Sequence, residues 1–369
     1  MSHCDPPPPP AATSYARLAP RQARATLALA ALVAGLLVAV SVASDADRRS
    51  RTPPGQGDVA LYRAEIEQIH AGEVYYDAAA AELTARGYPT RSVFNWRTPL
   101  PMGLIGRMPA IVLGQALLGL LALGLLLAGF EATARDNPGR IGRPLGTALL
   151  LTGPLMFCVL ADLFAMPVLW AGVLIGLSVA AFGLERPYWG VALGVAAVFF
   201  RELALPYAVA SAGMAAFAGR RRELLLWTLG LTAWAVFFAW HIAEVMPRIA
   251  PDARAHAQSW LQLGGAEFVL ATARMNAYLL LLPGWATALY LTAALLGLAG
   301  WSTPWGMRCG LTVCLFVGLF AFVGQEFNQY WGCLFGPLLC FGVARFPASL
   351  CELWHAAAFS MGPSRAVAG

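Results

Sequence analysis

The sequence alternates long apolar blocks with short polar connections. The blocks lie at about 25–43, 109–130, 145–161, 166–184, 188–200, 203–218, 224–241, 277–299, 309–323 and 331–343. Many approach the roughly 20 residues that a helix needs to cross a ~30 Å hydrocarbon core. They are continuously apolar and lack the alternation of a membrane-spanning strand. The pattern therefore predicts an all-α polytopic membrane protein with about ten transmembrane helices and a large trans-side loop after the first span.

Polar segments divide the predicted domain. Residues 1–24 contain a run of prolines, Pro6 to Pro10, and we expect a disordered cytoplasmic tail there. Residues 25–343 form the transmembrane domain, with polar loops at 44–108 and 242–275, and residues 344–369 form a second cytoplasmic tail. Two alternatives stay open. The first span ends in SVASDA, which is typical of a cleaved signal, and the short fifth and sixth blocks are also compatible with broken or re-entrant helices.

Composition agrees with a membrane protein. Hydrophobic residues make up 59% of the chain and charged residues 12%, whereas a soluble protein carries roughly a quarter charged residues. All 25 basic residues are arginine, which, with many Ala and Gly, indicates a bacterial genome rich in G and C. No basic surface interleaved with aromatic residues is evident, so we expect no nucleic-acid partner. The seven cysteines form no CxxC pair or zinc spacing and fit small apolar positions.

Arginine placement predicts the orientation. The short connections on one side hold Arg135, Arg140, Arg143, Arg186, Arg220, Arg221, Arg222, Arg308 and Arg345. The short connections on the other side hold almost none, with Arg201 as the exception. By the positive-inside rule, both termini lie in the cytoplasm of a bacterium and the protein is a multi-pass inner-membrane protein. Loop 44–108 then lies on the trans face.

The segment from Gly57 to Pro109 concentrates the polar chemistry of the chain. Asp58 stands in GDVALY, where it is either the N-cap of a helix or a general base at the membrane surface. Tyr62 and Glu65 follow on the same helical face. Further along come Tyr76, in YYD, and Arg97, in FNWRTP. These residues fit either an interfacial aromatic belt or a sugar platform beside a phosphate-binding arginine.

Other polar residues are predicted on the same trans face. Asp162 lies between the third and fourth spans, and Arg201 and Glu202 lie between the fifth and sixth. An arginine within a span costs ~2.5–3.5 kcal/mol, so Arg201 needs either a pair with Glu202 or an anion. Asn328 belongs to a polar turn that is also suited to hydrogen bonding a substrate.

A metal site is not predicted. His241 and Glu244 share a helix face and His256 follows them, but the spacing is not typical of metal ligands.

Together these features resemble the GT-C superfamily of integral-membrane glycosyltransferases. The shared features are a trans-side Asp58 shortly after the first span, a following Tyr62, the YYD turn after Gly72 and FNWRTP before the second span. The chain is most similar to bacterial mannosyltransferase-like members, which take one sugar from a polyprenyl phosphate. The motifs lie within about residues 57–109 and at a few later positions.

The resemblance implies a role for each matching residue. Asp58 would be the catalytic base and Asp162 a second catalytic acid. Arg201 and Arg97 would bind the donor phosphate. Substrate binding would fall to Tyr62, Tyr76, Glu202 and Asn328. The chain lacks the second acid directly after Asp58 and a sizeable C-terminal soluble domain, so a divalent metal is possible but not indicated, and no cofactor is implied.

The expected function is therefore inverting transfer of a monosaccharide. The donor would be a polyprenyl-phosphate sugar, and the acceptor would be a hydroxyl of a glycan or glycolipid. Membrane lipids would surround the protein. The alternative is a lipid or sugar transporter, or flippase, of the cell envelope. Transporters often contain internal repeats with paired broken helices, and the first loop has no counterpart in the second half of the chain. A third alternative is an assembly subunit without a site.

Overall fold

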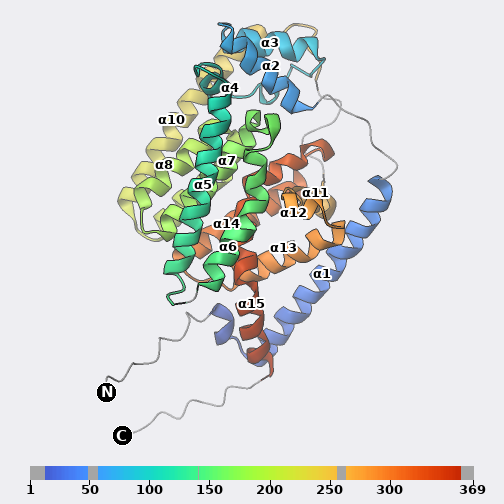
Figure 1. Cartoon of the computed structure of the whole chain (residues 1–369), viewed down its shortest axis with the longest axis vertical. Coiled ribbons are helices and arrows are strands. Elements are labelled where there is room, and N and C mark those ends of the chain that lie inside the picture. Colours follow the sequence, from blue (N-terminus) through green and yellow to red (C-terminus); the bar gives the residue numbers. More distant parts are fainter. Residues whose placement is uncertain (1–12, 49–56, 140, 256–262, 359–369) are drawn as a thin grey trace.

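The computed structural model describes residues 13–48, 57–139, 141–255 and 263–358, which fold into helices without a β-sheet (Figure 1). The α-helices are α1 (Pro20–Arg48), α2 (Asp58–His70), α3 (Tyr75–Ala85), α4 (Pro99–Gly106), α5 (Val112–Arg135), α6 (Gly142–Leu155), α7 (Pro167–Gly183), α8 (Pro187–Phe200), α9 (Leu205–Phe217), α10 (Arg221–Val245), α11 (Gly265–Ala273), α12 (Ala277–Leu280), α13 (Gly284–Ala299), α14 (Pro304–Phe322) and α15 (Gly336–Ala358). The 3-10 segments are η1 (Ser14–Arg17), η2 (Val93–Asn95), η3 (Met156–Cys158), η4 (Ala161–Ala165), η5 (Glu202–Ala204), η6 (Met246–Arg248) and η7 (Glu326–Leu334).

The all-α prediction is confirmed, but the helices long enough to span a membrane are fewer than about ten. Within the described ranges, four pass by length and composition: Pro20–Ser44, Val112–Arg135, Arg221–Arg248 and Pro304–Phe322. A bent pair, Phe327–Leu334 with Gly336–Ala358, makes a fifth candidate with a 61° bend. The other apolar blocks form shorter helices, among them α7, α8 and α13. The chain is a membrane protein with four to five candidate spans.

The break between α8 and α9 shows why some spans are short. Arg201 adopts an extended conformation, with φ −153° and ψ 118°, which ends α8 at Phe200. The chain then makes one 3-10 turn before α9 begins at Leu205 with a proline in its first turn. The two blocks expected here as a fifth and a sixth span are thus two short apolar helices.

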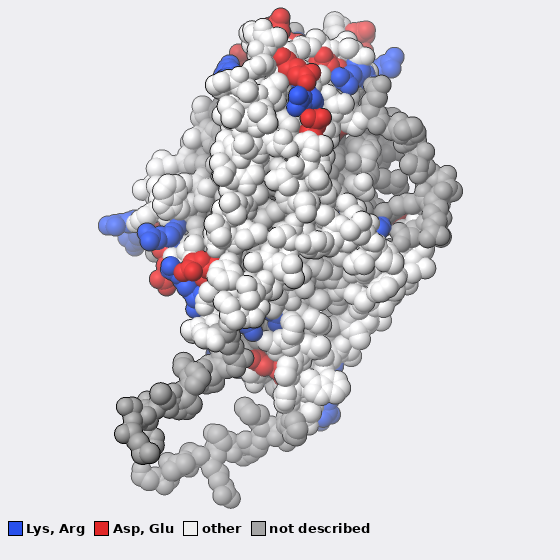
Figure 2. All heavy atoms as spheres, viewed as in Figure 1, with Lys and Arg blue, Asp and Glu red and all other residues white. Residues whose placement is uncertain are grey.

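The surface between the two ends of the molecule is apolar. Leucine and valine side chains on several helices are more than half exposed, among them Leu29, Leu120, Leu149 and Val236. Figure 2 shows charged side chains gathered toward the ends of this face, with a broad uncharged surface between them. A large exposed apolar surface marks a membrane or protein contact, and here it surrounds helices of membrane-spanning length.

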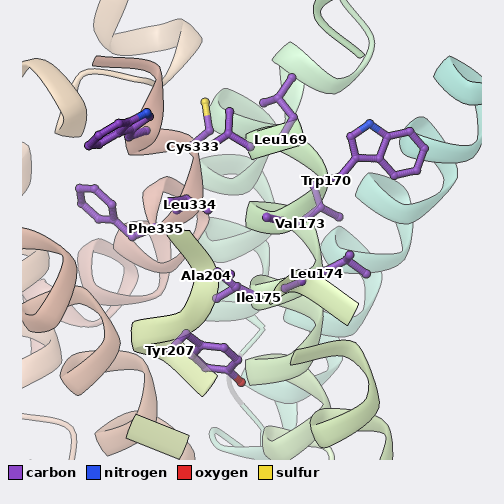
Figure 3. Close-up of a cluster of buried hydrophobic side chains, with 14 of the residues drawn as sticks. Leu169, Trp170, Val173, Leu174, Ile175, Ala204, Tyr207, Cys333, Leu334 and Phe335 are labelled. Carbon is purple, nitrogen blue, oxygen red and sulfur yellow. The ribbon is translucent and has the colours of Figure 1, made fainter. Parts of the chain in front are cut away.

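α7 is the centre of the core. All but three of its 17 residues are buried, because its sequence has no polar face. α5, α8 and η7 pack around it. Figure 3 shows Leu169 of α7 on the side toward Cys333 of η7, with Trp170 on the opposite side of the helix.

Glycines allow the closest helix contacts. A Cβ atom on Gly172 of α7 would collide with the carbonyl oxygen of Cys333. Where α13 crosses α15, a Cβ atom on Gly297 would collide with the carbonyl oxygen of Gly342. Small residues at such crossings let backbones approach and gain dispersion contacts, which is a common basis of helix association in membranes.

The helices α2, α3 and α4 form a cap at one end of the bundle, and the start of α1 and the end of α15 lie at the other (Figure 1). α1 packs on α13 and α15.

The structure differs from the two expected tails, 1–24 and 344–369, at the inner boundary of each. Residues 13–19 are anchored, because the Tyr15 hydroxyl donates a hydrogen bond to the Leu296 carbonyl at 3.0 Å. Helix α15 also continues past residue 343 to Ala358. Residues 1–12 and 359–369 of the two expected tails lie outside the described residues.

A single methyl group at the α13–α15 crossing should destabilise the protein. We expect Gly297→Ala to lower the thermal unfolding temperature in detergent by several degrees, since overpacking costs about 1–3 kcal/mol. The matched control is Gly318→Ala in α14, where an added Cβ meets nothing within 4 Å. Alanine there should leave the temperature unchanged or raise it, because it favours the helix by up to about 1 kcal/mol. Equal unfolding temperatures for the two variants would contradict the packing.

Candidate functional site

A cavity of about 710 Å³ lies between the α2–α4 cap and the helix bundle. We call it the cap cavity. Its polar lining includes Asp58, Tyr62, Arg86, Tyr88, Asn95, Arg97, Asn328 and Tyr330. Its apolar lining includes Phe157, Leu163, Met166, Val168, Leu169 and Met275. The cavity is thus amphipathic, and the segments that line it are far apart in the sequence.

Asp58 is held in this cavity by two tyrosines. The Tyr88 hydroxyl donates a hydrogen bond to Oδ1 at 3.1 Å, and the Tyr330 hydroxyl donates one to Oδ2 at 2.6 Å. Burial, followed by the charge of Asp58, raises the pKa of Tyr88, so its hydroxyl stays protonated and remains a donor. The carboxylate is fixed in place, and each of its oxygens keeps a further lone pair to accept a proton.

The structure does not support Asp58 as a simple helix cap. The N-cap of α2 is Gly57, and no side chain caps the first turn. Asp58 is instead the first helical residue, where the positive end of the helix dipole stabilises a negative charge. The sequence Gly57-Asp58 thus begins the helix and leaves the carboxylate available to the cavity.

Arg97 lies on the wall of the same cavity. Its Nε donates to the Tyr62 hydroxyl at 2.7 Å, and its Nη1 donates to the Phe94 carbonyl at 2.6 Å. The Tyr75 hydroxyl donates to the backbone carbonyl of Arg97 at 2.5 Å. The contacts with Tyr62 and Phe94 fix the guanidinium, the Tyr75 contact fixes the backbone, and no acid of the described residues forms an ion pair with Arg97.

Asn328 and Arg86 add polar groups to the lining. Asn328 is 1% exposed, and its Nδ2 has no hydrogen-bond partner within the described part of the chain. Arg86 forms an ion pair with Glu82 at 2.9 Å and also lines the cavity. An unsatisfied buried amide costs about 1–3 kcal/mol, so Asn328 is suited to a partner that enters from the cavity.

Arg201 lies near the cavity but does not line it. Its side chain is 3% exposed and its Nη1 is 3.3 Å from a carboxylate oxygen of Glu202. Nε and Nη1 make no geometrically good hydrogen bond among the described residues. Burial raises the pKa of Tyr62, and the charge of Arg201 acts in the opposite direction, so the guanidinium lies close enough to influence the cavity.

Two other predicted site residues are not brought to the cavity. Asp162, on η4, pairs with Arg63 of α2 at 3.0 Å, and its side chain is 58% exposed. The Tyr76 hydroxyl lies 3.0 Å from Nδ1 of the buried His241 on α10, away from the lining. The structure therefore groups Asp58, Tyr62, Arg97 and Asn328 on the cavity. It leaves four predicted site residues outside the lining: Asp162, Tyr76, Arg201 and Glu202.

The sequence interpretation missed the partners of Asp58. Tyr88 and Tyr330 are visible in the sequence as aromatics in polar turns, but they lie 30 and 272 residues from Asp58. The positive φ of Gly87, 69°, makes the turn that presents Tyr88. Of the sequence features, only the glycine before Tyr88 marks this turn, and no local signal marks Tyr330.

No group of three His, Cys, Asp or Glu side chains within the described ranges is placed to hold a metal ion. His256, one of the three residues considered as metal ligands, lies outside those ranges.

A comparison of the chain with known family models, curated proteins and solved structures finds no match.

One buried acid beside the cavity is held in its neutral form. Glu65, on α2, is 2% exposed, and its Oε2 has no partner among the described residues. Burial raises the pKa of Glu65 from its ordinary 4.5 to about 8. Near neutral pH the carboxyl is therefore largely protonated, which avoids the cost of a buried charge.

Stability should therefore fall as pH rises, and Glu65→Gln should remove part of that fall. The folded state binds the Glu65 proton more tightly than the unfolded state, so the contribution is complete below about 4.5 and is lost as pH rises to about 8. The expected loss is on the order of a few kcal/mol. Unfolding temperatures measured between pH 5 and 8 test this, with Glu73→Gln at an exposed position of the same cap as control. Parallel pH profiles for wild type and Glu65→Gln would contradict it.

Proposed function

We propose that this chain is an inverting glycosyltransferase of the GT-C type, which moves a monosaccharide from a polyprenyl-phosphate donor to an acceptor hydroxyl. In this proposal the cap cavity opens on the trans face of a bacterial inner membrane, and both termini are cytoplasmic. The observation that carries the proposal is the placement of Asp58 and Arg97 on one amphipathic cavity. The resemblance at residues 57–109 supports it.

The shape and lining of the cavity fit a lipid-linked sugar. The apolar wall, with Met166, Leu169 and Phe157, is suited to the polyprenyl chain. The polar wall offers hydroxyl, amide and guanidinium groups to the sugar and phosphate. A volume of about 710 Å³ is within the usual range for a small-molecule site.

Asp58 is proposed as the general base. The acceptor hydroxyl oxygen attacks the anomeric carbon and forms the new glycosidic bond, while its proton passes to a carboxylate oxygen of Asp58. The bond from the anomeric carbon to the phosphate oxygen breaks, and its electron pair leaves with the polyprenyl phosphate. Tyr88 and Tyr330 keep the carboxylate aimed during this step, which is a positioning role.

Arg97 is proposed to stabilise the departing phosphate. Negative charge grows on the leaving oxygens, and a preorganised guanidinium lowers the barrier without further rearrangement. Arg201, which is paired with Glu202 and does not line the cavity, would add to the positive electrostatic potential at the phosphate. Asn328 and Tyr62 would bind sugar hydroxyls. Asp162 and Tyr76 have no direct part in this step.

Asp58→Asn should abolish transfer while the protein still folds and inserts. General-base catalysis contributes typically 10²–10⁴-fold, so we expect a loss in that range. The matched control is Asp162→Asn, which makes the same change outside the cavity and should retain most activity. The assay follows label from a panel of radiolabelled polyprenyl-phosphate sugars into lipid, glycan and protein fractions of membranes. Equal activity of Asp58→Asn and wild type would reject the assignment.

A second outcome concerns the alternative function. If no donor gives transfer that Asp58→Asn abolishes, with native acceptor present, the result would favour a transporter, and a flux assay would then test it.

Arg97→Gln should lower kcat more than it raises the KM for the donor, since the guanidinium acts on charge that develops during transfer. Loss of one such charged donor costs about 10²–10³-fold in rate. The control is Arg107→Gln, an exposed residue at the end of α4 that does not line the cavity. A change in KM alone would assign Arg97 to ground-state binding.

A further inference from the structure

A second cavity, of about 970 Å³, lies at the end of the bundle opposite the cap. We call it the basal cavity. It lies among the end of α5, the starts of α8, α10 and α14, and the connection between α9 and α10. Five arginines and three acids line it, so its lining carries a net positive charge. Nothing in the proposed transfer reaction uses this cavity.

The deepest of these arginines is incompletely paired. Arg308 is 2% exposed and donates from Nη2 to Glu223 at 2.8 Å. The other Glu223 oxygen is 3.3 Å from Nη1 of Arg220, so one buried carboxylate serves two guanidinium groups. Nε and Nη1 of Arg308 have no hydrogen-bond partner in the described part of the chain, and the guanidinium lies over the Phe182 ring, 3.6 Å from its centroid. The cluster therefore keeps one uncompensated positive charge, and such charges in membrane proteins usually face a partner or a cavity.

A second acid of the lining is neutralised from outside the cavity. Asp136 forms a buried ion pair with Arg345, which is not part of the lining. Arg221 and Arg222 are exposed, and the structure gives them no ion pair or side-chain hydrogen bond with a described residue. Arg135 of the lining is likewise paired from outside, with Glu131 at 2.9 Å. These two outside pairs cancel, so the net charge of the basal cavity stays as positive as its lining indicates.

Helix ends add to this field. α8, α10 and α14 all begin at the basal cavity, at Pro187, Arg221 and Pro304. No side chain caps the first turn of α8 or α10, so free backbone N–H groups remain there. Helix N-termini carry partial positive charge and bind phosphate and other anions. The start of α14 is capped by the Thr303 side chain, which accepts from the Gly306 N–H. Two uncapped helix ends therefore lie beside the arginine cluster and add to its positive field.

We propose that the basal cavity binds a phosphate group. Arg221 and Arg222 contact the phosphate at the mouth of the cavity. The Arg220–Glu223–Arg308 cluster, deeper in the cavity, adds a positive electrostatic potential. The site lies at helix ends, the depth at which phospholipid head groups lie, and basic pockets between transmembrane helices bind such groups. The phosphate belongs either to an anionic phospholipid or to a soluble phosphate ester, and the two arms of the experiment below separate these sources.

The test measures ligand retention by the full-length protein in detergent. In one arm, native mass spectrometry follows titration with phosphatidylglycerol and, for comparison, phosphatidylcholine. In the other arm, thermal unfolding follows addition of glycerol phosphate. The variant is Arg221→Gln/Arg222→Gln, because both side chains are exposed and their loss leaves the buried Glu223–Arg308 pair intact. The matched control is Arg17→Gln/Arg21→Gln, two exposed arginines near the same end of the molecule that do not line the cavity.

We expect the wild type to bind one of the two phosphate ligands, and the cavity variant to bind it about thirtyfold more weakly, since each arginine near an anionic surface contributes roughly a factor of five or more. The control should change binding less than threefold. Loss in the phosphatidylglycerol arm identifies a lipid phosphate, and loss in the glycerol phosphate arm a soluble ester. Equal binding by the cavity variant and the control in both arms would overturn the proposal. Glycosyl transfer is not measured in either arm, so the outcome is independent of the proposed reaction.

Discussion

The close contact between α7 and η7 is the constraint on which the rest of the structure depends. Gly172 has no side chain, so the Cys333 backbone can lie directly on the most buried helix of the protein. Gly332 makes a similar contact with the backbone of Thr272 in α11. Because η7 is held on two sides by backbone, its polar residues have fixed positions. Asn328 and Tyr330 therefore reach the cap cavity as rigid groups, and Tyr330 can hold Asp58.

The same constraint divides the chemistry of the molecule between its two ends. The middle of the bundle is packed with apolar side chains and crossed by glycine contacts, so charged residues are stable mainly where helices begin or end. At the cap, one carboxylate faces tyrosines and a guanidinium. At the base, several guanidinium groups share too few acids. Each end therefore has its own electrostatic character, and the packed core keeps the two sites apart.

Much of this arrangement follows from local sequence. Continuous apolar blocks predict the all-α class, and each of the ten expected blocks overlaps a helix. The block 277–299 is divided into α12 and α13, however, and α15 continues past 343 to Ala358. Asp58, Tyr62, Arg97 and Asn328 were recognisable as polar residues of one face. Helix length was less predictable, because Arg201 ends α8 by adopting an extended conformation that composition does not reveal. The exclusion of Asp162 depends on its ion pair with Arg63, 99 residues away, and no local pattern encodes such a contact.

The hydrogen bond between Tyr330 and Asp58 joins residues 272 positions apart. During synthesis the N-terminal part of a chain emerges and folds first. The cap helices can form early, but among the described residues Asp58 then has Tyr88 as its partner, and Tyr330 joins it once η7 has packed against the cap. The cap cavity is therefore completed only after η7 has been synthesised. A chain that has not yet reached η7 carries the Asp58 carboxylate without Tyr330, so the polar lining of the cap cavity depends on a segment made long after the cap itself.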